Sequence, residues 1–321
     1  MPAKVLMIMG PTASGKTQLV LTLAQQIPIE IISVDSALIY RGMDIGTAKP
    51  SLTEQAAVPH HLLDIRRPDQ SYSVADFCHD AHALIQQISD RGRLAVLCGG
   101  TMLYFRALQT GLATLPEDPQ IRQQLQLDLQ QMGLAALHQR LCQLDAPAAQ
   151  RIHAHDTQRI LRALEINLIS GRQTGEFYAE QSAAAQHYNV MKLGLWTEDR
   201  AWLHKRIAHR FDQMLQQGFV DEVQQLLKAY PNIHLMAFRS VGYRQIIGHL
   251  HGEISLDEAR YRAIVATRQL AKRQFTWLRR EPALHKIDIA AMTDPVLRQK
   301  LFNKIKSFWE PVNGKATGVH D

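Results

Sequence analysis

The chain has 321 residues, a formal net charge of +6 and a pI near 9.3. This length predicts two domains and enough interior for an ordinary hydrophobic core. No apolar run approaches the roughly 20 residues that span a bilayer, and no signal-peptide pattern opens the chain, so we expect no membrane partner and a cytoplasmic location. Cys78, Cys98 and Cys142 are too widely spaced for a disulfide framework or a zinc module.

A phosphate-binding loop is the first motif along the chain, with the sequence GPTASGKT at residues 10–17. It fits the pattern G-x-x-x-x-G-K-[ST] and lies between an apolar run at 5–9, which predicts a buried strand, and a helical pattern at 17–26. Backbone N–H groups and the positive end of the helix dipole then point at one anion. The residues expected to bind a diphosphate are Gly10, Pro11, Thr12, Ala13, Ser14, Gly15, Lys16 and Thr17. Lys16 is expected on the outer phosphates, and the Thr17 hydroxyl on Mg²⁺.

Two further strand ends are predicted beside this loop, because the carboxyl ends of parallel strands line one crevice. The strand at 29–34 ends at Asp35, which is either a catalytic group or a turn and cap residue. The strand at 94–98 runs into Gly99, Gly100 and Thr101, where a nucleoside triphosphatase carries an Asp that holds magnesium. Thr101 therefore contacts a phosphate or a substrate, or caps the next helix.

The segment at 40–68 is rich in Gly, Pro and polar residues and predicts long functional loops. A helix is expected from Ser73 to Asp90, with Ser73 and Asp76 as a capping pair. Residues 1–115 and 190–321 form the expected α/β core, a P-loop fold with a parallel sheet and strands at 191–196 and 286–289. Residues 116–189 carry only helical patterns and are expected to form a helical insertion domain that binds nucleic acid.

Arginines at helical spacing occur in both parts of the chain. Arg159 and Arg162 share a face in the insertion, which suits phosphate, but pairing with Asp156 and Glu165 is equally compatible with the spacing. In the core, Arg206 and Arg210 share a face and are expected to clamp a pyrophosphate from the side opposite the loop.

The most basic stretch is 260–280, which holds seven Lys and Arg residues, interleaved aromatic residues and no acidic residue. A one-sign stretch favours a track for a polyanion over a solvated helix face. Such a stretch and the missing metal-holding Asp disfavour a small-molecule kinase. They favour an enzyme whose leaving group is pyrophosphate and whose acceptor is a large anionic polymer.

Seven segments in order resemble bacterial tRNA dimethylallyltransferases: GPTASGKT, VDSALIYRGMDIGTAKP, PHHLLD, CGGTMLY, DTQRILRALE, FRSVGYRQ and TRQLAKRQFTWLR. The resemblance implies a nucleotide-kinase-like core with a helical insertion. It implies transfer of a dimethylallyl group from dimethylallyl diphosphate to the N6 amine of the tRNA adenosine 3′-adjacent to the anticodon, by a monomer with Mg²⁺. The zinc finger found in many eukaryotic relatives has no counterpart in the spacing of Cys and His here.

The resemblance also implies roles for single residues. Asp35 is the catalytic base, and Thr101 and Arg210 contact phosphate. The residues implied to bind tRNA are Asp35, Ser36, Ala37, Leu38, Thr101, Gln123, Arg159, Ile160, Leu161, Arg162, Ala163, Ser240, Val241, Gly242, Tyr243, Arg244, Gln245, Ala266, Thr267, Arg268, Gln269, Leu270, Ala271, Lys272 and Arg273. Alternatives are an adenylate isopentenyltransferase, a small-molecule kinase, or an RNA-binding GTPase-like module, which would need an N-K-x-D motif that the chain lacks.

Overall fold

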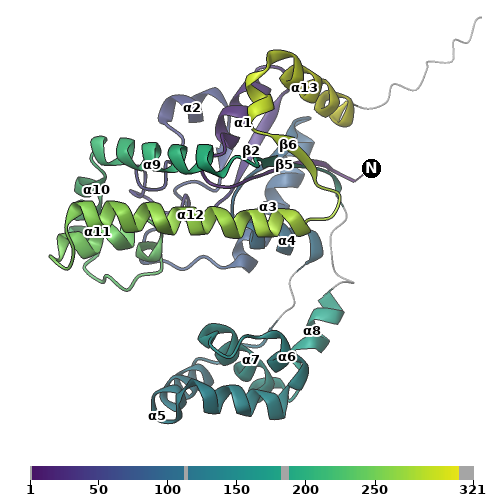
Figure 1. Ribbon diagram of the computed structural model, residues 1–321. Coiled ribbons are helices and arrows are strands. Elements are labelled where there is room, and N and C mark those ends of the chain that lie inside the picture. The colour runs from purple at the N-terminus through teal and green to yellow at the C-terminus, as the bar shows by residue number, and fades with distance from the viewer. Residues whose placement is uncertain (1, 112–114, 182–187, 311–321) are drawn as a thin grey trace, which may run out of the picture. The chain divides into compact units, whose positions relative to one another are not determined.

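A computed structural model describes residues 2–111, 115–181 and 188–310 (Figure 1). The chain divides into two compact units, Met1–Phe105 with Tyr188–Asp321, and Arg106–His187. The composition changes at Pro116, where the sequence predicted the start of the insertion. The boundary between the units instead falls inside helix α4 (Met102–Thr110), where the helical pattern gives no sign of it.

The first unit is built on a parallel sheet, which confirms the predicted α/β class. Its order in the described residues is β3-β2-β4-β1-β5-β6. The strands are β1 (Lys4–Met9), β2 (Ile29–Val34), β3 (His60–His61), β4 (Leu94–Gly99), β5 (Asn189–Trp196) and β6 (His285–Asp288). Sequence reasoning missed β3, because two histidines carry neither an apolar run nor an alternation. His61 is fixed there by a hydrogen bond between its Nε2 and Glu30 Oε2 at 2.7 Å.

Helices cover both faces of the sheet. On one face, Leu6, Ile8 and their neighbours pack against α1 (Lys16–Ala24) and α13 (Pro295–Trp309) in one hydrophobic core. Toward the other face lie α3 (Val74–Asp90) and α4, joined by the stacked rings of Phe77 and Tyr104 at 4.4 Å. Ser73 and Asp76 form the predicted capping box of α3.

Further helices complete the described part of this unit. They are α2 (Leu52–Ala57), α9 (Arg200–Gln216), α10 (Phe219–Ala229), the 3₁₀ helix η2 (Ala237–Arg239), α11 (Tyr243–Leu250) and α12 (Leu256–Arg280), while a second 3₁₀ helix, η3 (Ala290–Thr293), precedes α13. Helices α9 and α12 run side by side (Figure 1). The sequence predicted only loops at 40–68. Helix α2 was missed because it is short, with six residues and no buried side chain to give an apolar pattern.

The second unit is all-helical in its described residues, as predicted. It contains α5 (Pro119–Leu144), α6 (Ala146–Arg151), α7 (Thr157–Ser170) and α8 (Thr174–Gln181). Leu125, Leu137 and Leu141 of α5 pack against Ile160 and Leu164 of α7. Across the described ranges of both units, no helix has the length and apolar content needed to traverse a membrane.

Candidate active site

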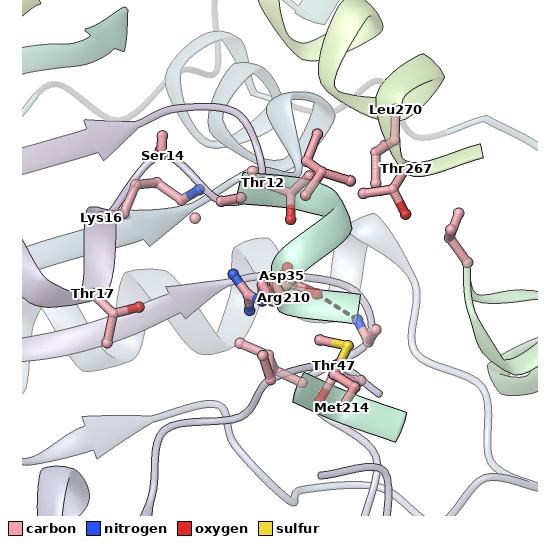
Figure 2. Close-up of a pocket in the computed structure, with 18 of the residues that line it drawn as sticks. Thr12, Ser14, Lys16, Thr17, Asp35, Thr47, Arg210, Met214, Thr267 and Leu270 are labelled. Carbon is pink, nitrogen blue, oxygen red and sulfur yellow. Dashed lines mark hydrogen bonds between the residues drawn. The ribbon is translucent and has the colours of Figure 1, made fainter. Parts of the chain in front are cut away.

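A cavity of about 550 Å³ lies in the first unit, where β1, β2 and β4 end (Figure 2). Its walls include the loop at 12–17, Asp35, Gly99 and Gly100, the segment around Thr47, and the facing sides of α9 and α12. Parallel strands bring their carboxyl ends to the same edge, so the topology gathers groups that lie far apart in the chain. The sequence predicted that the phosphate-binding loop, Asp35 and the glycines after β4 would lie together.

The phosphate-binding loop has the backbone that its glycines predict. Gly15 adopts a φ of +90° just before α1 begins at Lys16, a left-handed conformation that side chains disfavour. The Lys16 ammonium donates to the carbonyl oxygens of Gly10 (3.0 Å) and Pro11 (2.8 Å), and burial lowers its pKa to about 8. Ser14 Oγ is buried and has no hydrogen-bond partner among the described residues. A buried hydroxyl without a partner is costly, and an anion in this loop would satisfy it.

Asp35 lies directly after β2 and lines the cavity. Its Oδ1 accepts a hydrogen bond from the backbone N–H of Ala37 at 2.8 Å. The turn role that the sequence left open is therefore real, yet it occupies one oxygen and leaves Oδ2 without a hydrogen bond in the described part of the chain. One carboxylate thus holds the turn and faces the cavity. Ala37 and Leu38 line the cavity beside it, while Ser36 is exposed.

Thr101 connects the ends of β2 and β4. Its backbone N–H donates to Val34 O at 3.1 Å, and its hydroxyl accepts from Ser36 N at 3.2 Å. Thr101 is not among the residues that line the cavity. In this structure it fixes the turn that carries Asp35, and its direct contact with a phosphate or with tRNA stays a prediction.

Arg206 and Arg210 both line the cavity from α9, so the shared face expected from their spacing is present. Arg206 donates from Nε to Ala13 O at 2.9 Å, and its guanidinium lies over the Trp202 ring at 4.7 Å. Arg210 lies beside Asp35 (Figure 2). Burial lowers the pKa of Arg210, and the Asp35 carboxylate opposes that shift. Together with Lys16, two arginines bring positive charge to one end of the cavity.

Gln274 of α12 joins the two glycine-containing segments of the site. Its Oε1 accepts from the backbone N–H of Thr12 at 2.9 Å, and its Nε2 donates to Gly100 O at 3.0 Å. A Cβ at Gly100 would overlap the Gln274 amide nitrogen, so a side chain there would displace this amide. Sequence reasoning missed Gln274. The one available signal was an uncharged amide within a strongly basic helix, and that signal does not identify its partners.

The basic stretch on α12 is less uniform than the sequence indicated. Arg260 forms a two-bonded ion pair with Asp212 of α9, and Arg262 pairs with Glu258 one turn earlier. Both carboxylates lie outside residues 260–280, so this stretch alone does not reveal them. Farther along, Thr267, Leu270 and Gln274 line the main cavity.

The other side of α12 borders a second, smaller cavity of about 290 Å³. It is lined by Arg200, Leu203, His204, Val265, Arg268, Gln269, Ala271, Lys272, Phe275 and Arg279. Burial, Arg268 and Arg200 lower the pKa of His204. The residues expected to bind tRNA at 266–273 therefore face two cavities, and Arg273 is exposed. Within the described residues, Arg268, Lys272 and Arg279 form no salt bridge, and they lie from the middle of α12 to its end.

The turn at 240–242, just before α11, contributes Ser240 and Val241 to the main cavity. Gly242 has a φ of +95° and its N–H donates to the Gln245 side chain at 2.8 Å, which explains the glycine. Tyr243 is fully buried, and Arg244 is exposed. The turn ends at Gly242, and Tyr243 begins α11 (Tyr243–Leu250).

The candidate residues in the helical unit lie in two environments. Ile160, Leu161 and Ala163 pack in its hydrophobic core, and their contact with RNA stays a prediction. A run of consecutive residues on a helix cannot share one face. Gln123 is exposed. Arg159 pairs with Asp156, and Arg162 with Glu165 and Glu117, so the ion-pairing alternative is the one observed.

Comparisons with known proteins identify the family of the chain. The model of a family described as IPP transferase matches residues 38–281. The chain is 53% identical over 274 residues to a tRNA dimethylallyltransferase of Legionella pneumophila, covering 85% of this chain and 87% of the relative. It is 50% identical over 292 residues to a protein of the same name from Chromobacterium violaceum, with 90% and 89% covered. The solved full-length tRNA isopentenylpyrophosphate transferase of Bacillus halodurans superposes with a TM-score of 0.70 at 36% identity, over 96% of this chain and 97% of that one. The chain therefore belongs to the IPP transferase family.

Proposed function

We propose that the chain transfers the dimethylallyl group of dimethylallyl diphosphate to the exocyclic N6 amine of the tRNA adenosine 3′-adjacent to the anticodon. One observation carries the proposal. An anion-binding loop with a buried unpartnered hydroxyl, Ser14, faces the same cavity as the Asp35 carboxylate, whereas β4 ends in Gly99 and Gly100. A site for phosphoryl transfer would place a metal-holding carboxylate at that strand end.

The loop at 10–17 holds the diphosphate as a leaving group. Lys16 exchanges its two carbonyl partners for phosphate oxygens, and Ser14 donates its free hydroxyl. Arg210 and Arg206 neutralise the charge that grows on the diphosphate as the carbon–oxygen bond breaks. Because the allylic carbon tolerates positive charge, alignment and charge neutralisation supply most of the catalysis.

Asp35 serves as the base. The adenine amine is a weak nucleophile because its lone pair is delocalised into the ring. As nitrogen bonds to the allylic carbon, the carbon–oxygen electron pair leaves with the diphosphate and the amine proton passes to Asp35 Oδ2. The hydrogen bond from Ala37 to Oδ1 keeps that second oxygen turned toward the cavity.

The site can hold Mg²⁺ through one protein oxygen together with the phosphates of the substrate. The described residues hold no cluster of three His, Cys, Asp or Glu side chains that would form a protein cage. Mg²⁺ commonly keeps its waters and binds through one or two protein oxygens plus substrate phosphates. The Thr17 hydroxyl, which lines the cavity at the start of α1, would be that protein oxygen. The ion would supply further charge neutralisation on the diphosphate.

tRNA is the proposed acceptor because Arg268, Lys272 and Arg279 of α12 line the second cavity and form no salt bridge within the described part of the chain. Reaching a stacked base requires its extrusion, at a cost of a few kcal/mol, which backbone contacts must offset. The relatives are tRNA dimethylallyltransferases, which supports the same acceptor. The monomeric state and the cytoplasmic location stay predictions.

The test is one set of parallel incubations. The protein, Mg²⁺ and radiolabelled dimethylallyl diphosphate are combined with unmodified tRNA, with adenosine monophosphate, or with ATP and tRNA. Label in tRNA alone is the expected result. Label in the free nucleotide would move the activity to an adenylate isopentenyltransferase, and ATP consumption without label transfer would support a kinase.

Asp35→Asn tests the base. It is expected to lower the single-turnover rate by about a hundredfold while tRNA affinity is kept. An unchanged single-turnover rate would remove Asp35 from that role.

A further inference from the structure

A part of the cavity wall unrelated to the phosphate-binding loop comes from the segment between β2 and α2. Gly46, Thr47, Ala48 and Pro50 line the cavity there. Residues 44–46 belong to no helix or strand. A wall without ladder or helix hydrogen bonds needs another way to keep its shape, since its backbone groups must still be satisfied.

Glu222, in the first turn of α10, supplies these bonds. Its Oε2 accepts from the backbone N–H groups of Asp44 at 2.9 Å and Ile45 at 2.6 Å, and its Oε1 accepts from that of Gly46 at 3.2 Å. A fourth donor, the Tyr243 hydroxyl, reaches Oε1 at 2.6 Å. Each carboxylate oxygen therefore accepts two hydrogen bonds, and bonds to a charged acceptor are stronger than neutral ones.

Close packing fixes the same segment. Phe219 and Tyr243 are both fully buried and meet edge to face, with their ring centroids 5.0 Å apart. A Cβ added at Gly46 would overlap the Phe219 ring and lie 2.6 Å from Tyr243 Cε2. The backbone of Gly46 thus rests directly on the two rings and leaves no room for a side chain. The segment can occupy this position only while α10 and Tyr243 hold theirs.

Tyr243 extends the arrangement to a second wall. It follows Ser240 and Val241, which line the same cavity. Burial and the negative charge of Glu222 raise the pKa of Tyr243 far above its usual range, so the hydroxyl remains a donor at every working pH. Glu222 is therefore bonded to Gly46 in the first wall and to Tyr243, which lies two residues after Val241 of the second wall.

We propose that Glu222 and Tyr243 form a positioning pair, which holds the 46–50 wall and the 240–241 wall of the cavity in register for the transfer reaction. Neither residue touches the reacting atoms in this assignment. The proposal rests on the proposed function for its kinetic effect, because misaligned walls matter only if they align the allyl group and the adenine. Small displacements of reacting groups cost rate more than affinity.

Glu222→Gln and Tyr243→Phe are the two variants, with Asp221→Asn as the matched control. Asp221 is the exposed neighbour of Glu222 in the same helical turn, so the control loses the same charge at the same helix end. Both variants should stay folded, because other bonds also hold the segment between β2 and α2. The Lys49 ammonium donates to Asp44, Asp64 and the Tyr40 carbonyl. Tyr243→Phe also keeps the ring on which Gly46 packs.

Two readouts are measured on the full chain: amide hydrogen exchange at Asp44, Ile45 and Gly46, and the steady-state kinetics with tRNA and dimethylallyl diphosphate. Glu222→Gln is expected to accelerate exchange at these amides and to lower kcat roughly tenfold or more, with KM for the diphosphate nearly unchanged, since the loop at 10–17 is intact. Tyr243→Phe should lower kcat about threefold in the same pattern. Asp221→Asn should match the wild type.

Unchanged amide exchange in Glu222→Gln would overturn the positioning pair. Faster exchange with unchanged kcat would overturn it as well, because the bonds would then serve folding alone. An equal fall in kcat for Asp221→Asn would assign the effect to charge. If the wild type fails to prenylate tRNA, the proposed function fails, and the exchange comparison still shows whether Glu222 holds the wall.

Discussion

Two arginine pairs with nearly the same spacing have opposite surroundings in the two units. Arg206 and Arg210 on α9 form no salt bridge in the described part of the chain, and both line the cavity. Arg159 and Arg162 on α7 are each paired with carboxylates. Helical spacing therefore shows which side chains share a face, but it does not show whether that face is neutralised.

Tertiary structure makes the difference. Arg162 reaches Glu117, which precedes α5, and Glu165, which is nearly fully buried. On α9, Arg206 finds a carbonyl of the phosphate-binding loop instead of a carboxylate. A cation left without a counter-ion beside a cavity is available for an anionic ligand, whereas a paired cation must first give up its partner.

Removing Arg210 is expected to produce the largest effect. Arg210→Ala should lower kcat/KM for dimethylallyl diphosphate by about a hundredfold, because it deletes a half-buried charge that stabilises the departing diphosphate. Arg162→Ala, the matched change in the helical unit, should leave the single-turnover rate at saturating tRNA within about threefold. Equal losses of single-turnover rate for the two variants would erase the distinction between the pairs.

Raising the pH separates Lys16 from the two arginines. The pKa of Lys16 is about 8, whereas arginine stays charged. Bound diphosphate favours the charged ammonium and so raises this pKa, which means that the affinity is fully present below pH 8 and falls as the pH rises above it. Titration of diphosphate affinity between pH 7 and pH 9.5 should show this decline. An affinity that stays flat over this range would mean that Lys16 contributes no charge to binding.

Arg162→Ala should act on stability. It leaves the buried Glu165 carboxylate with Arg122 as its remaining cation and should cost about 1–2 kcal/mol of unfolding free energy. Burial raises the pKa of Glu165, but the hydrogen bonds from Arg162 and Arg122 outweigh it and lower the pKa.

A carboxyl group with a lowered pKa stabilises the fold above its unfolded pKa, about 4.3, and loses that contribution as the pH falls through the folded value. Urea unfolding of wild type and Arg162→Ala at pH 7 and pH 3.5 should therefore show a difference that shrinks in acid. A difference that is the same at both pH values would mean that Glu165 does not carry it.

Arg159→Ala is expected to have the smallest effect. Its side chain is 72% exposed and its ion pair with Asp156 spans 3.4 Å, so loss of the pair should change stability by less than about 0.5 kcal/mol. If Arg159 contacts tRNA as the family resemblance implies, tRNA affinity should fall a few-fold and the salt dependence should become shallower by about one phosphate contact. Identical salt slopes for variant and wild type would exclude that contact.

The sequence predicted those parts of the fold whose signals are local. Apolar runs located the strands from β1 to β6 with the exception of β3, and the capping pair of α3 was readable because Ser73 and Asp76 are neighbours. The glycines and Lys16 of the phosphate-binding loop, and Asp35 at a strand end, were found for the same reason.

The residues that sequence reasoning missed act through distant partners. Gln274 bonds Thr12 across 262 positions, and Glu222 bonds the backbone of Asp44 across 178. Both side chains are bonded to backbone groups, which exist at every position and carry no sequence signal. The ion pair between Arg260 and Asp212 was hidden similarly, because the one-sign stretch at 260–280 does not show which acidic residues of other helices lie beside it.

The hydrogen bond between Asp35 and Ala37 has an entropic consequence. A free aspartate would lose rotamer freedom when the substrate arrived, and that loss would oppose the reaction. Asp35 has already lost this freedom during folding, because Oδ1 is bonded to the backbone two residues ahead. The folded sheet therefore keeps Asp35 Oδ2 directed at the cavity. No reorganisation of this side chain is needed before it takes a proton.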